Sequence, residues 1–424
     1  MNTRHDAVAE TVRIEGTRIL ATLIRTVGDV QLAEDAVQEA TVAALNAWPV
    51  TGVPPEPRAW LTVTARRKAI DILRRERARA EKERAGTELL EQTRPEHSGL
   101  DLEDPERFEL EPADIVPDDL LRLIFTCCHP SLSPATRVAL ALRTLCGLSP
   151  AQIAGVLLTT EVATTKRLVR ARQKIAAARI PYRVPTESEL PDRLPAVCAV
   201  IHSLYTAGHA PLEGEAAYDV DLCTEAIRLA ELLHSLLPEQ PTPTAILALL
   251  LLSESRRPAR LNEAGEAVTL DLQDRSLWDQ SLITRGVALL NDSLIRSDRQ
   301  ADPYQLQAAI AAEHARVPSY SATDWREILR LYDLLIDLAP SPAAELARAV
   351  AKAEADGPEA ALPLLDAVPP TPRSQAVRAE LLARLHRYDE AVAELTNSLA
   401  GPTTATERLH REQRLEHFRS RAAG

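Results

Sequence analysis

The chain has 424 residues, of which 45% are hydrophobic and 3% aromatic, and its formal net charge is -12. This length suits two to four domains rather than one, and the hydrophobic fraction excludes wholesale disorder. The negative charge argues against nucleic acid only for the chain as a whole, because a local basic patch can oppose it. Ala, Leu and Arg dominate and β-branched runs are scarce, which predicts an all-α protein.

The sequence contains no segment typical of export or membrane insertion. The first ten residues hold no apolar run, and the longest apolar stretch, 245–252, is far too short to span a bilayer. The cysteines are five in number and irregularly spaced, which argues against a disulfide framework. We therefore expect a soluble, cytoplasmic protein with no membrane partner.

Residues 6–77 are predicted to form helices. In the segment 29–48 the apolar residues share one side: Ala33, Ala36, Val37, Ala40, Ala44 and Leu45. Four prolines and a glycine predict a loop over 49–57. In the next helix, about 58–79, the apolar positions Ala59, Val63, Ile70 and Leu73 leave the arginines on the other faces.

Residues 86–119 have a different composition, with twelve acidic and two basic residues and several prolines. They predict a flexible acidic linker between two domains. Beyond it, short helices are expected over 120–180. Ser133-Pro134 and Ser149-Pro150 are helix-start signals, and Thr160 is a candidate cap for a helix over 161–178.

The second half of the chain, 186–424, is predicted to be a larger acidic helical region broken by short turns. Segments 344–368 and 375–399 resemble each other, and Glu359-Ala360 recurs as Glu390-Ala391, 31 positions later. This pattern favours a stack of antiparallel helix pairs of the tetratricopeptide kind.

Two helices are strongly basic. Residues 58–84 carry a local charge of +6 and residues 161–183 again +6, with the -10 linker between them. Basic surface binds phosphate through charge and counterion release, although a single basic helix is equally consistent with a solvated face. Two such helices, each within a compact helical segment, favour nucleic-acid binding.

The second basic segment has the pattern of a helix-turn-helix. Ile153, Ala154 and Leu157 would pack inward from the first helix. On the second helix the inward spacing i, i+4, i+7, i+11 is met by Thr164, Leu168, Ala171 and Ile175. A generic helical hairpin shares this periodicity but does not need so many cations on its second helix.

Residues 148–175 resemble region 4 of bacterial sigma factors, which reads the -35 promoter element. The segment 29–40 resembles region 2.2, and 57–75 resembles regions 2.3 and 2.4, which open and read the -10 element. Two such regions joined by a variable linker is the layout of the extracytoplasmic-function group. The resemblance covers about 1–180 and implies two partners: core RNA polymerase, through its β′ coiled coil and β flap, and promoter DNA.

The resemblance also implies site residues. Core-polymerase binding falls on one face of the 29–48 helix, at Asp35, Gln38 and Glu39, whose polar groups can meet arginines of a partner. The resemblance implies that the -10 element, whose bases can be splayed from the stack, is bound by six residues of the next helix. They are Arg58, Arg66, Arg67, Lys68, Arg74 and Arg75. The -35 element falls to Glu161, Thr165, Lys166, Arg167, Arg170 and Arg172.

Three positions bear on these assignments. Arg67 stands where the family often has Asn, and Leu158 stands where the turn usually has Gly. Trp60 could stack on a base, but a core position is the favoured interpretation. The candidate loop that shapes the base pocket is 50–57.

No enzymatic constellation is found, and neither a cofactor nor a metal is expected. Cys127-Cys128-His129 lacks a second pair of ligands at a suitable spacing for zinc, so core cysteines are the favoured interpretation. The sequence also lacks a nucleophile elbow, an HExxH motif and a glycine-rich phosphate loop.

The second half resembles the C-terminal extension of one sigma-factor subgroup, where it is thought to regulate activity. Its polar residues include a candidate regulatory cluster: Arg256, Arg257, Arg260, Asp271, Asp274, Arg275 and Trp278. This cluster could bind a ligand or partner, or contact the sigma regions within the same chain. A buried salt-bridge network between mixed charges is the favoured alternative.

The expected domains are region 2 over 1–84, the acidic linker over 85–118, region 4 over 119–182, a helical extension over 183–300 and tetratricopeptide-like repeats over 301–424. The expected function is a sigma factor, not an enzyme, whose extension regulates it. The alternative is a stand-alone helix-turn-helix regulator with a helical-repeat sensor, and the segment 29–39 distinguishes the two because such a regulator has no use for a polymerase-binding helix.

Overall fold

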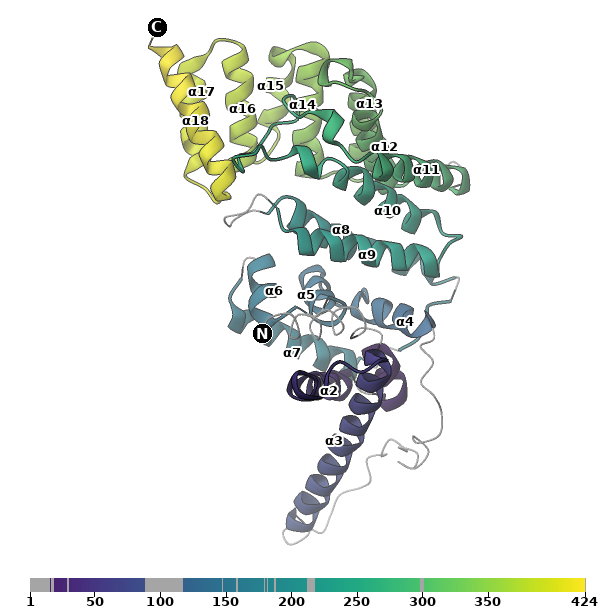
Figure 1. Ribbon diagram of the computed structural model, residues 1–424. Helices are drawn as coiled ribbons and strands as arrows, with labels where there is room; N and C mark the ends of the chain where they lie inside the picture. The colour runs from purple at the N-terminus through teal and green to yellow at the C-terminus, as the bar shows by residue number, and fades with distance from the viewer. Residues whose placement is uncertain are drawn as a thin grey trace. The chain divides into compact units, whose positions relative to one another are not determined.

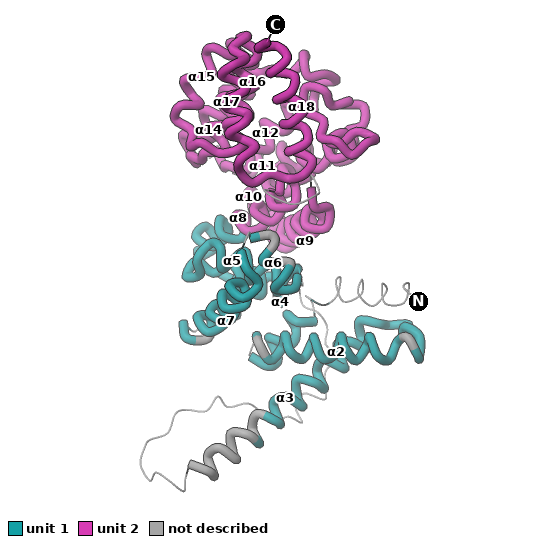
Figure 2. The backbone as a smooth tube through the Cα atoms, turned by 90° about the vertical axis from the view of Figure 1, so that its left-hand side faces the viewer, with its two compact units in different colours: residues 1–197 teal, residues 198–424 magenta. Residues whose placement is uncertain are grey.

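The computed structural model describes residues 16, 19–28, 30–87, 117–146, 148–157, 159–178, 180, 182–186, 188–211, 218–297 and 301–423. Within these residues every regular element is a helix, apart from an isolated antiparallel bridge between Leu261 and Ala267. The predicted all-α fold is therefore confirmed. The chain divides into two compact units, residues 1–197 and 198–424 (Figure 2).

The first unit opens with a helix over 19–27, followed by α2 (Val30–Thr51) and the long α3 (Pro57–Thr87), which pack together (Figure 1). The predicted inner face of α2 is confirmed, since Ala33, Ala36, Ala40 and Ala44 are at most 1% exposed. α2 continues beyond the predicted start of the loop and ends at Thr51. Gly52 then turns the chain with a φ of 84°, a conformation that favours glycine.

The buried face of α3 differs from the predicted one. Val63 is 49% exposed and Ala59 is also exposed, whereas Leu61, Ala65 and Ala69 are at most 3% exposed. These three follow an i, i+4, i+8 stripe on one face of the helix. The larger apolar residues suggested the wrong face, because small alanines let α3 approach α2 closely.

The rest of the first unit is built from short helices: α4 (Pro117–Cys127), α5 (Pro134–Thr144), α6 (Pro150–Val156) and α7 (Glu161–Ala177). The Thr160 hydroxyl accepts a hydrogen bond from the Ala163 N–H at 3.2 Å, as predicted for the cap of α7. Ser133 occupies the N-cap of α5, but its hydroxyl bonds the Thr136 hydroxyl instead of a backbone N–H. The acidic segment 88–116 and Leu158 lie outside the described residues.

The division between the units falls within α8 (Leu190–His209). In the second unit α10 (Pro241–Glu254) packs against α9 (Val220–Leu236), α11 (Gln280–Arg296) and α12 (Pro303–Ala315). Its residues from Pro243 to Leu252 are all buried, so it is apolar all round, as expected of a central helix. The short 3-10 helices η2 (Arg257–Ala259) and η3 (Arg275–Leu277) connect α10 to α11.

The remaining helices follow one another side by side (Figure 1). They are α13 (Trp325–Leu338), α14 (Pro342–Asp356), α15 (Pro358–Asp366), α16 (Pro372–Arg384), α17 (Tyr388–Leu399) and α18 (Ala405–Ala422). The pairs α14–α15 and α16–α17 form a tetratricopeptide-like repeat. Buried Ala361 and Leu365 correspond to buried Ala391 and Leu395, so the structural repeat is 30 residues and not the 31 suggested by the recurring Glu-Ala.

Candidate functional site

α7 has an apolar inner face and a cationic outer face. Thr164, Leu168 and Ala171 are at most 3% exposed, which confirms the predicted inner face. On the other side Arg167 is half-buried, and the exposed residues are Glu161, Thr165, Lys166 and Arg170. α6 packs against α7 with Ile153 and Ala154 buried, so the two helices have the packing that a helix-turn-helix requires.

α2 has its candidate polar residues on the face opposite its alanines. Asp35 and Gln38 are exposed, and Glu39 is half-buried. The Glu39 carboxylate lies 3.4 Å from Lys68 Nζ and 3.4 Å from an Arg75 guanidinium nitrogen, both on α3. Two of the predicted -10 cations are therefore joined to one of the predicted polymerase-binding residues.

The other cations of α3 vary in exposure. Arg67 and Arg74 are exposed, whereas Arg58 and Arg66 are half-buried. Trp60 is half-buried and packs edge-on against the buried Trp48 of α2, with ring centroids 5.5 Å apart. This places Trp60 at the edge of the α2–α3 core.

Sequence reasoning missed a set of contacts that join the first two helices to the helix-turn-helix part of the same unit. Glu34 is 5% exposed, accepts a hydrogen bond from the Thr144 hydroxyl at 3.1 Å, and forms an ion pair with Arg172 of α7. Arg172 was predicted to contact DNA, but its guanidinium is paired with the Glu34 carboxylate instead. The signal in the sequence is an acidic residue next to Ala33 and Ala36 on an apolar face.

A second polar contact lies nearby. Asp119 is fully buried at the start of α4, and its carboxylate accepts a hydrogen bond from Arg25 Nε at 2.9 Å. The Tyr182 hydroxyl lies 3.0 Å from the Ala21 carbonyl oxygen and 3.1 Å from that of Asp119. Burial and the Asp119 charge raise the pKa of Tyr182, so its hydroxyl keeps the proton that these bonds need.

The cysteines of α4 are core residues, as the sequence predicted. Cys127 and Cys128 are each 2% exposed and unpaired. Burial raises the pKa of the Cys128 thiol to about 12, so it remains protonated and unreactive near neutral pH. In the described part of the chain, no three His, Cys, Asp or Glu side chains are grouped to hold a metal ion.

The candidate cluster of the second unit is not the mixed salt-bridge network that we favoured. Arg257 pairs with Glu254 at 2.5 Å, outside the predicted set. Asp274 accepts a hydrogen bond from the Ser276 N–H at the start of η3 instead of pairing with an arginine. Asp271 is exposed. Arg256 and Arg275 instead lie over the Trp278 ring, at 5.3 and 5.0 Å from its centroid.

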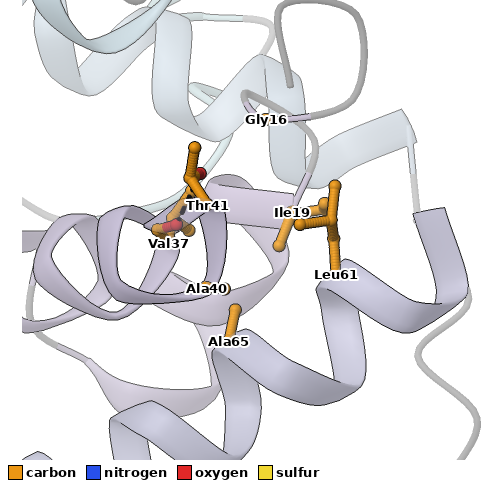
Figure 3. Close-up of a pocket in the computed structure, with 7 residues that line it drawn as sticks. All are labelled: Gly16, Ile19, Val37, Ala40, Thr41, Leu61 and Ala65. Carbon is orange, nitrogen blue, oxygen red and sulfur yellow. Dashed lines mark hydrogen bonds between the residues drawn. The ribbon is translucent and has the colours of Figure 1, made fainter. Parts of the chain in front are cut away.

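A hollow in the first unit lies between the 19–27 helix, α2 and α3 (Figure 3). Its described lining is Gly16, Ile19, Val37, Ala40, Thr41, Leu61 and Ala65. None of these side chains is titratable, so this lining offers no acid, base or metal ligand.

Comparison with known proteins agrees with this geometry. The model of sigma-70 region 2 matches residues 12–79, and the model of sigma-70 region 4 matches residues 122–175. A family of unknown function, DUF6596, matches residues 193–294. The chain belongs to the extracytoplasmic-function sigma factors that carry a C-terminal extension. The alternative of a stand-alone regulator leaves the region 2 match unexplained.

Two relatives extend this result. An uncharacterised protein of Rhizobium meliloti (strain 1021) is 38% identical over 410 residues, which is 95% of this chain and 94% of that protein. A probable ECF RNA polymerase sigma factor, SigI of Mycobacterium tuberculosis, is 33% identical over 184 residues, 42% of this chain and 57% of SigI. Among solved structures, yeast Tom70 aligns with a TM-score of 0.37 at 13% identity, over 99% of this chain and 85% of Tom70.

The residue ranges of the two sigma-70 matches show which regions the buried contacts join. Glu34 lies in region 2, and Thr144 and Arg172 lie in region 4, so one carboxylate joins the two regions of the sigma factor. None of the described helices combines the length and the apolar composition needed to cross a membrane.

Replacing Glu34 by Ala should destabilise the first unit by about 3 kcal/mol, because it leaves the largely buried Arg172 without its carboxylate. The measurement is the urea unfolding midpoint of the full chain. Asp35→Ala is the matched control, since the adjacent Asp35 is exposed and its loss should change stability by no more than about 0.5 kcal/mol. Equal effects of the two changes would show that the pair does not hold the regions together.

Proposed function

We propose that this sigma factor binds core RNA polymerase through α2 and directs promoter-specific initiation. In this proposal α3 acts at the -10 element and α7 at the -35 element. The observation that carries it is the division of charge within one unit: an acidic, exposed face on α2 and a separate, exposed cationic face on α7. A stand-alone DNA-binding protein needs only the second of these.

The chemistry of each face fits its role. Asp35 and Gln38 are one helical turn apart on α2, so a carboxylate and an amide can bind arginines of a partner helix together. Lys166 and Arg170 are likewise one turn apart on α7, in position to meet phosphates or base edges in the major groove. SigI, the relative in Mycobacterium tuberculosis, is itself named as a probable RNA polymerase sigma factor.

Reconstitution with core polymerase tests the function. The full chain should make core polymerase start transcription at specific sites of genomic DNA, detected by sequencing the transcripts. The double change Asp35→Ala and Gln38→Ala should weaken binding to core at least about tenfold, because it removes two polar contacts of roughly 1 kcal/mol each. The control is Asp221→Ala, an exposed acid of α9. Absence of specific starts, with the protein alone shifting duplex DNA, would contradict the proposal.

The -35 role of α7 has its own test on a promoter found in this way. Lys166→Ala, a phosphate-type contact, should weaken binding of the holoenzyme evenly across sequences and reduce the salt slope by about 1. Arg170→Ala should do the same if it binds phosphate, or relax the preference at one base pair if it reads a base. Arg330→Ala, an exposed arginine of α13 paired with Glu327, is the control. An unchanged salt slope for both α7 variants would exclude this face from DNA binding.

We further propose that the extension regulates the sigma regions. The support is electrostatic: residues 186–424 carry a net charge of -13, opposite in sign to the basic helices. An acidic body on the same chain competes with DNA phosphate for these cations, and the competition weakens as salt rises.

Truncation after residue 185, ahead of α8, tests this regulation. Promoter-directed transcription by the shortened chain with core polymerase should rise, and most strongly at low salt, because the acidic competitor has been removed. Unchanged or lost activity would contradict inhibition by the extension, while leaving the sigma-factor proposal to its own test above.

A further inference from the structure

In the second unit three arginines lie close together and have no carboxylate partner among the described residues. They are Arg256, which follows α10, Arg260, which follows η2, and Arg275 of η3. Arg260 donates to the backbone oxygen and the Nδ1 of His209, at 2.7 and 3.1 Å. Arg275 is 6% exposed and donates to two backbone carbonyls and to the Thr323 hydroxyl.

Arg256 is half-buried, is influenced by the charges of the other two arginines, and is the least satisfied of the three. Among the described residues, none accepts a hydrogen bond from its guanidinium, and its Nε is buried. Its guanidinium carbon lies 5.3 Å from the centroid of the Trp278 ring. Burial, together with the charges of Arg260 and Arg275, lowers the pKa of Arg256 to about 10, so it remains charged at neutral pH.

Other donors around Arg256 are also unsatisfied. The buried nitrogens that have no hydrogen-bond partner among the described residues include Arg256 Nε, Arg275 Nε, Trp278 Nε1 and His314 Nδ1. Three of these are obligatory donors, and His314 Nδ1 can donate in one tautomer. Both arginines lie over Trp278, and both influence His314, so the four groups surround one place in the fold. A bound group that carries acceptor oxygens would satisfy these N–H donors.

Three described carboxylates of the neighbourhood already have partners. Glu254 pairs with Arg257 and accepts from the Tyr205 hydroxyl at 3.2 Å. Asp274 and Asp279 cap η3 and α11. Burial and the arginines lower the pKa of His209 and of His314 to about 3, so both rings are neutral and do not add to the positive charge. Within the described part of the chain the three arginines therefore have no carboxylate to balance them, with Arg275 buried and Arg256 and Arg260 half-buried.

A cation that is partly removed from water and has no counter-charge is destabilising, and an anion bound beside it offsets that cost. We propose that Arg256, with Arg275, Trp278 and His314, binds the oxyanion group of a small-molecule ligand, a phosphate or a carboxylate. Both groups present oxygens that the planar guanidinium fork binds in pairs, and both accept from indole and imidazole N–H. This site is independent of the proposed regulatory role, because it is defined by binding alone.

The test is calorimetric titration of the full chain with inorganic phosphate and, separately, with acetate, at constant ionic strength set by sodium chloride. At least one of the two should bind saturably. Binding of phosphate alone indicates a phosphorylated ligand, and binding of acetate alone indicates a carboxylate ligand. The proposal would be overturned if neither anion bound saturably. It would also be overturned if titration with sodium chloride at the same ionic strength gave the same binding heat.

Variants locate the site. Arg256→Met should lower the affinity for the anion at least about tenfold. Arg256→Lys should lower this affinity less, because lysine keeps the positive charge but lacks the planar guanidinium fork. The control is Arg330→Met, whose arginine is exposed and paired with Glu327, and its affinity should equal that of the wild type. Equal affinity of R256M and wild type would contradict the site.

Stability without ligand provides a second measurement. R256M should unfold at the same temperature as the wild type or higher, because it removes a half-buried charge that has no ion-pair partner among the described residues. A lower unfolding temperature for R256M, with no effect on anion binding, would identify Arg256 as a structural residue that packs on Trp278 and overturn the proposal.

Discussion

A charge that leaves water must find its partners inside the protein, and this constraint fixes the arrangement of the first unit. Glu34 lies on the inner face of α2 among alanines, where an unpaired carboxylate would be costly. Its partners, Thr144 and Arg172, come from α5 and α7, more than a hundred residues along the chain. One carboxylate therefore holds together the helix proposed to bind polymerase and the helix proposed to bind DNA. With Arg172 paired inside the unit, Lys166, Arg167 and Arg170 are the predicted -35 cations that remain on the outer face of α7.

In the second unit a charge is also removed in part from water, but it does not form an ion pair with a described residue. Its central helix α10 is apolar all round, and the chain becomes polar where that helix ends. Arg257 pairs with Glu254, whereas the Arg256 guanidinium lies over the face of Trp278 and forms no ion pair with a described residue. The contrast between Glu34, with two partners, and Arg256, with no ion pair, distinguishes a structural charge from one that suits a ligand.

Periodicity was sufficient to predict the faces of α2 and α7, because both alternate clearly between apolar and polar residues. It failed for α3, where the stripe that includes Ala59 and Val63 was predicted to face inward: Val63 is exposed, while Ala65 is fully buried. Close approach of two helices selects small residues, and a single sequence does not show which helices approach. The predicted salt-bridge network at 256–278 was wrong for a similar reason, since an aspartate that caps a helix and one that pairs with an arginine look alike in sequence. Contacts such as Glu34 to Arg172 depend on tertiary packing alone.

The positions of Lys68 and Arg75 suggest how the two proposed partners of region 2 influence each other. Both cations share the carboxylate of Glu39 at 3.4 Å, and all three side chains are more than a third exposed. If Glu39 turns to arginines of the polymerase, Lys68 and Arg75 become available to DNA phosphate. Exposed pairs of this kind contribute about 0.2–1 kcal/mol each, so releasing two of them favours DNA binding by a factor of about 2 to 30. By linkage, DNA on α3 favours polymerase on α2 by the same factor. A pair of weak surface contacts can thus couple the two binding events, whereas the buried Glu34 pair is too strong to exchange partners in this way.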